Sequence, residues 1–395
     1  MSNANDVVIV SYARTPFGSF QGALSSLSAP KLGAHAIAAA LERSGMKKDQ
    51  VTEVIMGNVL QAGIGQAPAR QAMIYAGLPN SVHALTVNKV CGSGMKALML
   101  ARQSIMTGES TVVVAGGMES MTNAPYAFLN ARGGFRLGNQ VATDLMIHDG
   151  LWDPYNNQHM GNCGELCARE KHYTREMQDE FAISSFKRAL DAQKNGKFKR
   201  EIAAISVSAG KGDAVQVEQD EGPAKVKFDK IPTLKPAFDK AGSVTAANAS
   251  TLNDGATALV VMSGDQARKM GLKPLARIVA VASFSQEPVW FTTAPVGAMK
   301  RVIENAGWKQ SNVDLFEVNE AFAVVALAAE KELGIAREQL NIWGGAISIG
   351  HPIGASGARI VGTLIEQLRD TGKKRGVAGI CIGGGEATAV AVEVI

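Results

Sequence analysis

The chain has 395 residues, 46% of them apolar and 19% charged, and a formal net charge of +4. This balance excludes a disordered chain and leaves room for two or three globular domains. So small a net charge gives no reason to expect nucleic acid as a partner. The basic runs 194–200 and 373–375 fit solvated helix ends better than a binding patch.

Four cysteines are too few for a disulfide framework. The N-terminus shows no signal-peptide pattern, and no apolar run reaches transmembrane length. We therefore expect a cytoplasmic protein without a membrane partner.

Short β-rich runs alternate with helical patterns along the chain. This alternation is typical of layered α/β proteins. The expected helices are Leu32–Ser44, Met95–Met106, Val296–Asn305 and Ala358–Arg369, and the expected strands are Val7–Val10, Val54–Met56, Thr111–Ala115, Leu315–Val318, Val377–Ile382 and Ala387–Val394.

The two ends of the chain resemble each other. Residues 44–51 resemble 306–313, 93–94 resemble 356–357, and 115–117 resemble 382–384, at offsets of 262, 263 and 267. Residues 256–258 resemble 387–389 at an offset of only 131. The ordered matches predict a duplicated fold. The smaller offset of the last match predicts an insertion in the first half, at about residues 122–252. That segment holds most of the irregular, polar sequence.

Cys91 precedes a glycine-rich turn, residues 92–94, that opens a predicted helix. A helix N-terminus stabilises a thiolate, and glycines allow a substrate to approach the backbone. Cys91 is therefore a candidate nucleophile.

His351 precedes the corresponding helix of the second half, between a glycine and a proline. An imidazole there could take a proton from a thiol. Since lone histidines are usually structural, it is the repeat-related position that favours a functional role.

Cys381 ends a strand and is followed by three glycines, of which Gly383 could offer an N–H group to an oxyanion. Asn319 lies between a strand and a helix and could hold a water or a carbonyl. The alternatives are a buried strand cysteine and a helix N-cap.

A zinc site at His159, Cys163, Cys167 and His172 is disfavoured, because the spacing matches no common zinc module. We expect no metal. The run Gly63-Ile64-Gly65 lacks the rest of a dinucleotide fingerprint and is interpreted as a turn.

Several segments together resemble the thiolase family. They are residues 90–97 around Cys91, 319–323, 344–359 around His351 and 381–385, with support from 14–18 and 115–120. The resemblance spans essentially the whole chain.

The resemblance implies a duplicated five-layer αβαβα fold with an inserted loop domain that binds coenzyme A. The implied domains are 1–121 with 253–272, the insertion 122–252, and 273–395. A homo-oligomer, dimer or tetramer, is also implied.

The implied reaction joins two acetyl-CoA molecules into acetoacetyl-CoA and CoA, or reverses this, with no cofactor beyond these thioesters. Cys91 would be acylated and His351 would activate it. Cys381 would remove the α-proton of the second acetyl group. Asn319 and His351 would stabilise the enolate, and N–H groups of Cys91 and Gly383 would hold the acyl oxygen.

The family's coenzyme A contacts carry over to positions in and beside the insertion. These are Leu151, His159, Met160, Phe238, Ala246, Ala249, Ser250, Leu252, Phe291, Ala321 and Phe322. Pro223 stands near a position where an arginine is usual, so Lys225, Lys227 or Lys230 could contact the phosphates. Glu386 follows the glycines where methionine, glutamine or glycine is usual, and it would raise the pKa of Cys381 only if it faced inward.

Two alternatives remain beside this reading. A thiolase of β-oxidation would act on longer 3-ketoacyl-CoAs, and a non-catalytic acyl-CoA or lipid-binding protein would have lost a reactive residue. A decarboxylating ketoacyl synthase is disfavoured because Asn319 stands where that class has a second histidine.

Overall fold

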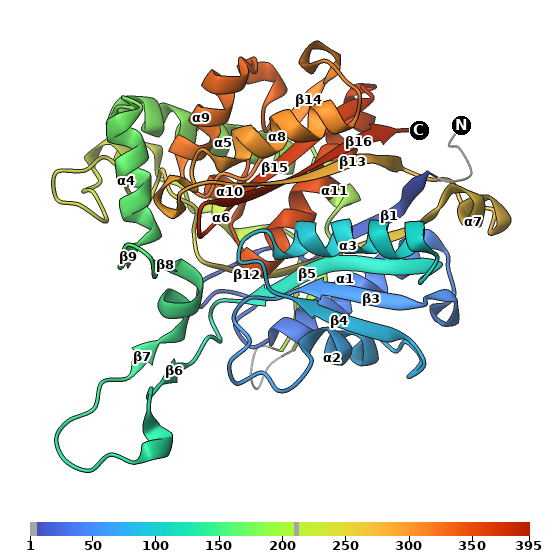
Figure 1. Ribbon diagram of the computed structural model, residues 1–395, viewed down its shortest axis with the longest axis horizontal. Helices are drawn as coiled ribbons and strands as arrows, with labels where there is room; N and C mark the ends of the chain where they lie inside the picture. The colour runs from blue at the N-terminus through green and yellow to red at the C-terminus, as the bar shows by residue number, and fades with distance from the viewer. Residues whose placement is uncertain (1–5, 209–212) are drawn as a thin grey trace.

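The computed structural model describes residues 6–208 and 213–395. Its helices and sheets form five layers, with two sheets that enclose a central pair of helices and outer helices on either side (Figure 1). This is the duplicated α/β arrangement that the sequence predicts.

The first sheet belongs to the N-terminal half. Its strands run in the order β4 (His83–Val87), β3 (Glu53–Gly57), β5 (Val112–Ser120), β12 (Asn253–Ser263) and β1 (Val7–Arg14). Helices α1 (Ala29–Ser44) and α2 (Pro68–Tyr75) cover its outer face, and the short helix α7 (Gly264–Lys269) follows β12.

The second sheet belongs to the C-terminal half. Its order is β13 (Ala276–Ser285), β16 (Glu386–Val394), β15 (Arg375–Ile382) and β14 (Leu315–Val318), with α8 (Ala294–Asn305) and α9 (Ala323–Leu333) outside. A single parallel bridge from Phe316 to Leu340 occupies the fifth position. Strands β1 and β13 also pair briefly, at Val8–Arg277 and Ile9–Ala276, so the two sheets meet along one edge.

The central layer consists of α3 (Ser93–Thr107) and α11 (Ile353–Thr371). Strand residues alternate between the layers, as a buried strand requires. In β5, Val112 and Val114 pack with the outer helices, whereas Val113 and Ala115 pack with the central ones. The central helices therefore share one core with both sheets.

Glycines allow these two helices to touch. A Cβ on Gly94 would lie 2.9 Å from the Gly354 oxygen and the Ala358 nitrogen, and a Cβ on Gly357 would lie 2.6 Å from the Met95 nitrogen. The starts of α3 and α11 are thereby brought together.

Every helix and strand expected from the sequence is present, with longer bounds in most cases. The resemblance between 44–51 and 306–313 also has a structural counterpart. The short 3₁₀ turns Lys48–Gln50 and Gln310–Asn312 carry the same side-chain cap: the Lys47 N–H donates to Gln50 Oε1, and the Lys309 N–H donates to Asn312 Oδ1.

Residues 121–252 connect β5 to β12, whose ends pair at Ser120 and Asp254. This segment is more regular than expected. It contains three α-helices, α4 (Met160–Glu170), α5 (Arg175–Lys194) and α6 (Glu221–Ala224). It also has a π-helical turn (Ile147–Leu151) and 3₁₀ turns at Ala131–Gly133, Lys197–Arg200 and Phe228–Thr233. Three short strand pairs complete it: β6 (Tyr126–Ala127) with β7 (Thr143–Asp144), β8 (Trp152–Asp153) with β9 (Gln158–His159), and β10 (Ile205–Val207) with β11 (Val215–Val217). Its α4 and α5 share a hydrophobic core with the C-terminal half. The exact domain boundaries stay a prediction.

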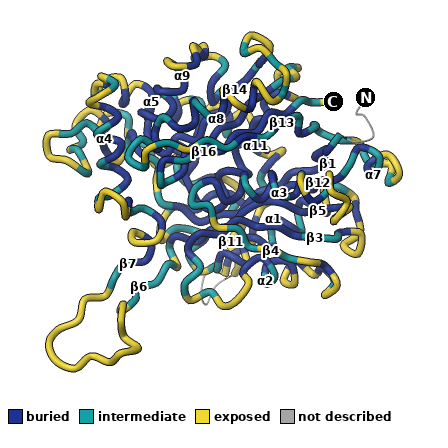
Figure 2. Tube along the Cα trace, in the orientation of Figure 1, coloured by how far each residue is buried: buried dark blue, intermediate teal, exposed yellow. Residues whose placement is uncertain are grey.

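Residues 128–142 form an extended loop between β6 and β7 that projects from the body, at the lower left of Figures 1 and 2. Every residue of the loop is exposed.

No helix of the described residues has both the length and the apolar character needed to cross a membrane.

Candidate active site

Cys91 lies in a turn, residues 88–92, between β4 and α3, and we call it the nucleophile turn. Val90 has φ 45°, a left-handed conformation that strains a β-branched residue. Three hydrogen bonds hold it there: Val90 N to Asn88 Oδ1 at 3.0 Å, Ser93 Oγ to the Val90 oxygen at 2.6 Å, and Lys89 N to Ser93 Oγ at 2.8 Å. The cysteine is therefore presented by a strained but well-fixed backbone.

His351 occupies the corresponding place before α11, as the repeat predicts. Its Nδ1 lies 2.7 Å from Ser356 Oγ, and its Nε2 lies 3.4 Å from Asn319 Nδ2. Ser356 Oγ is also 3.0 Å from the Pro352 oxygen, which can only accept, so we assign the hydroxyl proton to that bond. Nδ1 then carries the imidazole proton, and Nε2 offers a lone pair.

Cys381 is fully buried near the end of β15, and residues 383–385 form the glycine turn that leads into β16. Gly384 and Gly385 have φ 91° and 82°, which favour glycine. The N–H groups of Gly383 and Cys91 both point at the Cys91 sulfur. Two backbone donors, one from each half of the chain, thus converge on the sulfur that is the candidate nucleophile.

The pKa shifts of Cys91, Cys381 and His351 all favour the neutral forms of these three side chains. Burial raises the pKa of Cys91 to about 12, although the two N–H groups act in the opposite direction. Burial, together with the charge of Cys91, raises the pKa of Cys381 well above its usual value. Burial and the Arg359 charge lower the pKa of His351 to about 3. The expectation of a thiolate stabilised by the helix N-terminus stays a prediction, because burial and the two N–H groups act on the pKa of Cys91 in opposite directions.

Asn319 follows β14 and is fully buried. Its backbone N–H bonds the Gly379 oxygen at 3.0 Å, which fixes it beside β15. Its side-chain oxygen has no hydrogen-bond partner among the described residues, so it can accept a bond from a bound molecule.

A cavity of about 510 Å³ opens above Cys91, His351 and Gly383. Its wall is mostly apolar and includes eleven further residues that the sequence resemblance placed at the substrate: Leu151, His159, Met160, Phe238, Ala246, Ala249, Ser250, Leu252, Phe291, Ala321 and Phe322. The structure thus gathers residues from both halves and from the insertion around one pocket, with Asn319 and Cys381 buried behind its wall.

Two family profiles match this chain. The thiolase N-terminal domain matches residues 7–265, and the thiolase C-terminal domain matches residues 272–394. This chain belongs to the thiolase family.

Similar proteins span its full length. The thiolase is 53% identical over 395 residues to acetyl-CoA acetyltransferase 2 of Arabidopsis thaliana, covering 100% of this chain and 98% of the relative. It is 53% identical over 389 residues to the acetyl-CoA acetyltransferase of Cupriavidus necator, covering 98% and 99%. It is 51% identical over 391 residues to the mitochondrial acetyl-CoA acetyltransferase of Rattus norvegicus, covering 98% and 91%.

Aromatic rings narrow the pocket of this thiolase. His159 stacks on Phe238 with centroids 4.7 Å apart, and Phe322 meets the edges of Phe238 and Phe291 at 6.1 and 6.2 Å. His159 Nδ1 accepts the Gly161 N–H at 3.0 Å, so it also caps α4. Burial lowers the pKa of His159, which favours its neutral form.

The lysines expected at the phosphate end lie outside this wall. Lys225 is exposed and bonds Glu221 at 3.2 Å and the wall residue Ser19 at 2.9 Å, so it sits at the rim. Lys227 and Lys230 are also exposed, and Lys230 lies 3.8 Å from Asp229. Pro223 is buried and does not line the pocket. Phosphate binding by these lysines stays a prediction.

Glu386 behaves in neither of the two ways anticipated. Its carboxylate pairs with Lys89 at 2.5 Å and accepts a bond from Ser285 Oγ at 3.1 Å. It is therefore neither directed at Cys381 nor a free surface group.

The sequence did not predict ten residues of the pocket wall, nor the buried carboxylate of Glu119 that holds the backbone near the pocket. The further wall residues are Ser19, Phe20, Met121, Met146, Ile147, Gly150, Ala237, Thr245, Thr251 and Ile353. Glu119 accepts bonds from the nitrogens of Val59, Leu60 and Gly354. Its place at the end of a strand in residues 115–120 was the available signal.

The four residues weighed as a zinc site do not gather around one point. Cys163 lies 3.3 Å from Gln158 Nε2 and 3.8 Å from Asp153 Oδ2, and both α4 cysteines are buried. His172 is exposed beyond the helix. Among the described residues, no group of three or more histidine, cysteine or carboxylate side chains is placed to hold a metal.

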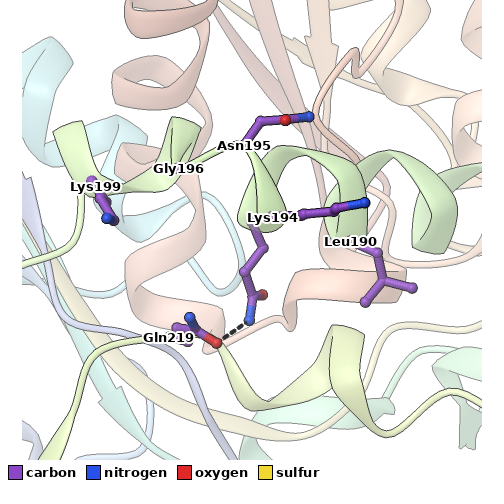
Figure 3. A pocket seen from close by; sticks show the side chains of 7 residues that line it. Leu190, Lys194, Asn195, Gly196, Lys199 and Gln219 are labelled. Atoms are coloured by element: carbon purple, nitrogen blue, oxygen red, sulfur yellow. Dashed lines mark hydrogen bonds between the residues drawn. The ribbon is translucent and has the colours of Figure 1, made fainter.

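A second cavity lies at the C-terminal end of α5 (Figure 3). Leu190, Lys194 and Lys199 line it, and Gln193 bonds Gln219 across it at 2.6 Å. Its lining shares no residue with the first cavity and contains no cysteine, histidine or carboxylate. Its described lining therefore lacks the thiol and the imidazoles that line the first cavity.

Proposed function

We propose that this thiolase is an acetyl-CoA C-acetyltransferase, which joins two acetyl-CoA molecules into acetoacetyl-CoA and free CoA and also catalyses the reverse thiolysis. The observation that carries the proposal is one pocket shared by Cys91, His351 and Gly383, with a second thiol, Cys381, buried behind it. Full-length relatives at 51–53% identity that are named acetyl-CoA acetyltransferases support it.

The first half-reaction transfers an acetyl group to Cys91. Nε2 of His351 accepts the thiol proton while the sulfur attacks the thioester carbonyl, so no free thiolate has to form first. The N–H groups of Cys91 and Gly383 bind the oxyanion. Removing one such donor typically costs about 10²–10³ in turnover. The C–S bond to CoA then breaks.

Cys381 has to lose its own proton before it can act as a base. If its thiol protonates the departing CoA sulfur, Cys381 becomes a thiolate while the proton from Cys91 remains on His351. That thiolate, buried behind the pocket wall, can then take the α-proton of a second acetyl-CoA.

The second half-reaction forms the carbon–carbon bond. The carbanion attacks acetyl-Cys91, and the enolate oxygen is stabilised by His351 and by Asn319, directly or through water. Acetoacetyl-CoA forms, the Cys91–acetyl bond breaks, and Cys91 recovers its proton from His351. All three groups return to their starting protonation states.

Mass spectrometry of the protein with acetyl-CoA tests this scheme. We expect one acetyl group on Cys91 and none in Cys91→Ser, which should also lose condensation. A Cys91→Ser protein with normal turnover would overturn the assignment. CoA binding without turnover in wild type would revive the non-catalytic alternative.

A substrate-length series separates acetoacetyl-CoA from longer substrates. We expect thiolysis of acetoacetyl-CoA to be much faster than thiolysis of a ten-carbon 3-ketoacyl-CoA, because the rings of Phe291, Phe322 and Phe238 crowd the pocket. Faster turnover of the ten-carbon substrate would instead support the β-oxidation alternative.

We also propose a homo-oligomer, a tetramer, that uses the loop 128–142. This loop exposes apolar side chains: Phe128, Leu129, Phe135, Leu137 and Val141 are 46–96% exposed. Such a surface is typical of a protein contact. Light scattering should report a smaller assembly for Leu137→Asp than for wild type, and an unchanged mass would contradict this role of the loop.

A cytoplasmic location fits the four cysteines, which are all free thiols. Cell fractionation with an antibody against the protein tests this proposal, and recovery in an organelle fraction would contradict it.

A further inference from the structure

The nucleophile turn, residues 88–92, lies against the glycine turn, residues 383–385, although the two belong to different halves. Val90 Cγ1 is 3.7 Å from the place that a Cβ of Gly383 would occupy. Gly92 lies against Ile382, whose side chain would clash with any Cβ there. The donor pair at the Cys91 sulfur takes one N–H from each turn, so the spacing between the turns sets the geometry of the site.

One ion pair ties the two turns together. Lys89, two residues before Cys91, lies 2.5 Å from a carboxylate oxygen of Glu386, the residue that follows the glycine turn. The other oxygen of Glu386 accepts a bond from Ser285 Oγ at 3.1 Å, and these two residues are also paired between β13 and β16. Glu386 is therefore anchored to the second sheet, and it holds the first half through Lys89.

The nucleophile turn needs such a hold, because Val90 is in a strained conformation. Strained backbone persists only where its surroundings over-determine it. The bonds from Asn88 and Ser93 act within the turn itself. They fix its shape, whereas the ion pair ties it to the opposite half.

We propose that Lys89 and Glu386 are positioning residues that fix the nucleophile turn against the glycine turn, so that one N–H group from each turn meets the same oxygen. This inference rests on the proposed acylation of Cys91. The pair does not touch the reacting atoms, and it acts on the rate of acyl transfer rather than on substrate affinity.

Four variants test the pair: Lys89→Met, Glu386→Gln, the charge swap Lys89→Glu with Glu386→Lys, and the control Lys171→Met. The control breaks another partly exposed pair, Lys171–Glu332 at 2.8 Å, whose residues do not line the pocket. Each protein is assayed for the rate of Cys91 acetylation by mass spectrometry, for kcat and KM, and for its thermal midpoint.

We expect each single variant at the pair to lower the acetylation rate and kcat about tenfold, since small displacements of catalytic groups have effects of this size or larger. KM should stay within about twofold, because the pocket wall is untouched. Thermal midpoints should move by no more than about 2 °C, since a partly exposed ion pair contributes little to stability. The control should match wild type.

The charge swap distinguishes positioning from a direct effect of the lysine charge. Positioning predicts that the swap recovers acetylation to within about threefold of wild type, and that the two single losses are not additive. Raising the salt concentration should slow wild type towards the rate of Lys89→Met, because the side chains are 23% and 35% exposed and are screened.

Several outcomes would overturn the proposal. If Glu386→Gln is as fast as wild type, Lys89 acts without its partner. If the swap is no faster than the single variants, the pairing is not what matters. Equal acetylation rates in all proteins would contradict the positioning role alone, whereas a wild type that never acetylates Cys91 would contradict the proposed function itself.

Discussion

Ser356 fixes the tautomer of His351. The Ser356 oxygen accepts the Nδ1 proton at 2.7 Å and gives its own proton to the Pro352 carbonyl at 3.0 Å. The lone pair on Nε2 then faces Asn319 and the pocket. A base with the other tautomer would present a proton to the thiol and could not receive one.

The Ser356→Ala variant tests this relationship. Without the hydroxyl, either ring nitrogen of His351 can carry the proton, and the ring can rotate, so we expect kcat to fall about tenfold or more with little change in KM. Steady-state thiolysis of acetoacetyl-CoA measures both constants.

A matched control is available on the same helix. Thr363 is also a buried hydroxyl of α11, and it bonds Glu201 at 3.1 Å away from the pocket. Thr363→Ala should lower stability without lowering kcat. Equal losses of kcat in the two variants would point to a general effect on the helix instead of a tautomer effect.

The raised pKa of Cys91 predicts slow, pH-dependent alkylation of the free enzyme. Only the thiolate reacts with iodoacetamide, and a pKa of about 12 leaves a small thiolate fraction throughout the neutral range. The alkylation rate of Cys91, followed by mass spectrometry, should rise about tenfold per pH unit from pH 7 to 10. A plateau below pH 9 would show that the helix N-terminus prevails over burial after all.

The lowered pKa of His351 predicts a loss of stability in acid. The folded protein binds a proton at His351 only near pH 3, whereas the unfolded chain binds one below about 6.5. The unfolded state therefore holds more protons between these values, and the free energy of unfolding falls as pH drops through this window.

The His351→Gln variant lacks this titration. Between pH 6.5 and 5, wild type should lose about 1.5 kcal/mol more than the variant in urea unfolding. Parallel stability curves would mean that the folded protein protonates His351 freely.

The contact of α3 with α11 at Gly94 predicts that Gly94→Ala damages both stability and activity. The added Cβ would lie 2.9 Å from backbone atoms of Gly354 and Ala358, so the helices must separate. We expect a loss of about 2 kcal/mol in the free energy of unfolding, together with lower kcat.

Gly133→Ala is the control for this substitution. Gly133 lies in the exposed loop, and nothing is within 4 Å of its added Cβ. Urea unfolding and kcat should both match wild type. An unaltered Gly94→Ala protein would show that the central helices tolerate displacement.

The sequence predicts structure best at positions where only one kind of residue meets the local requirement. Glycines at 92, 94 and 383–385, the offset repeats and the apolar strand runs together predict the layers and the site. The missed helices have weaker patterns. In α5 the buried face includes Gln178, Asp179 and Ser185, which interrupt the apolar period. The helix expected after Asn319, which is α9, received no bounds from the sequence because its almost continuous apolar run has no helical period.

The protonation states of side chains and the partners of ion pairs depend on distances in the folded chain. These distances cannot be read from the spacing of residues in the sequence. A position before a helix suggests a low pKa for Cys91, whereas its burial in the folded site acts to raise that pKa. In the same way, Glu386 lies close to Cys381 in sequence, yet its partner is Lys89, almost three hundred residues earlier. Such contacts appear only when the two halves are folded together.

The equivalent positions of Cys91 and His351 limit how this site could have arisen. Two identical copies of a half-chain, related by symmetry, would carry the same residue before both central helices. Such a pair could offer two thiols or two imidazoles, but never one of each. The division of labour between nucleophile and base therefore required the two copies to differ in sequence at these equivalent positions.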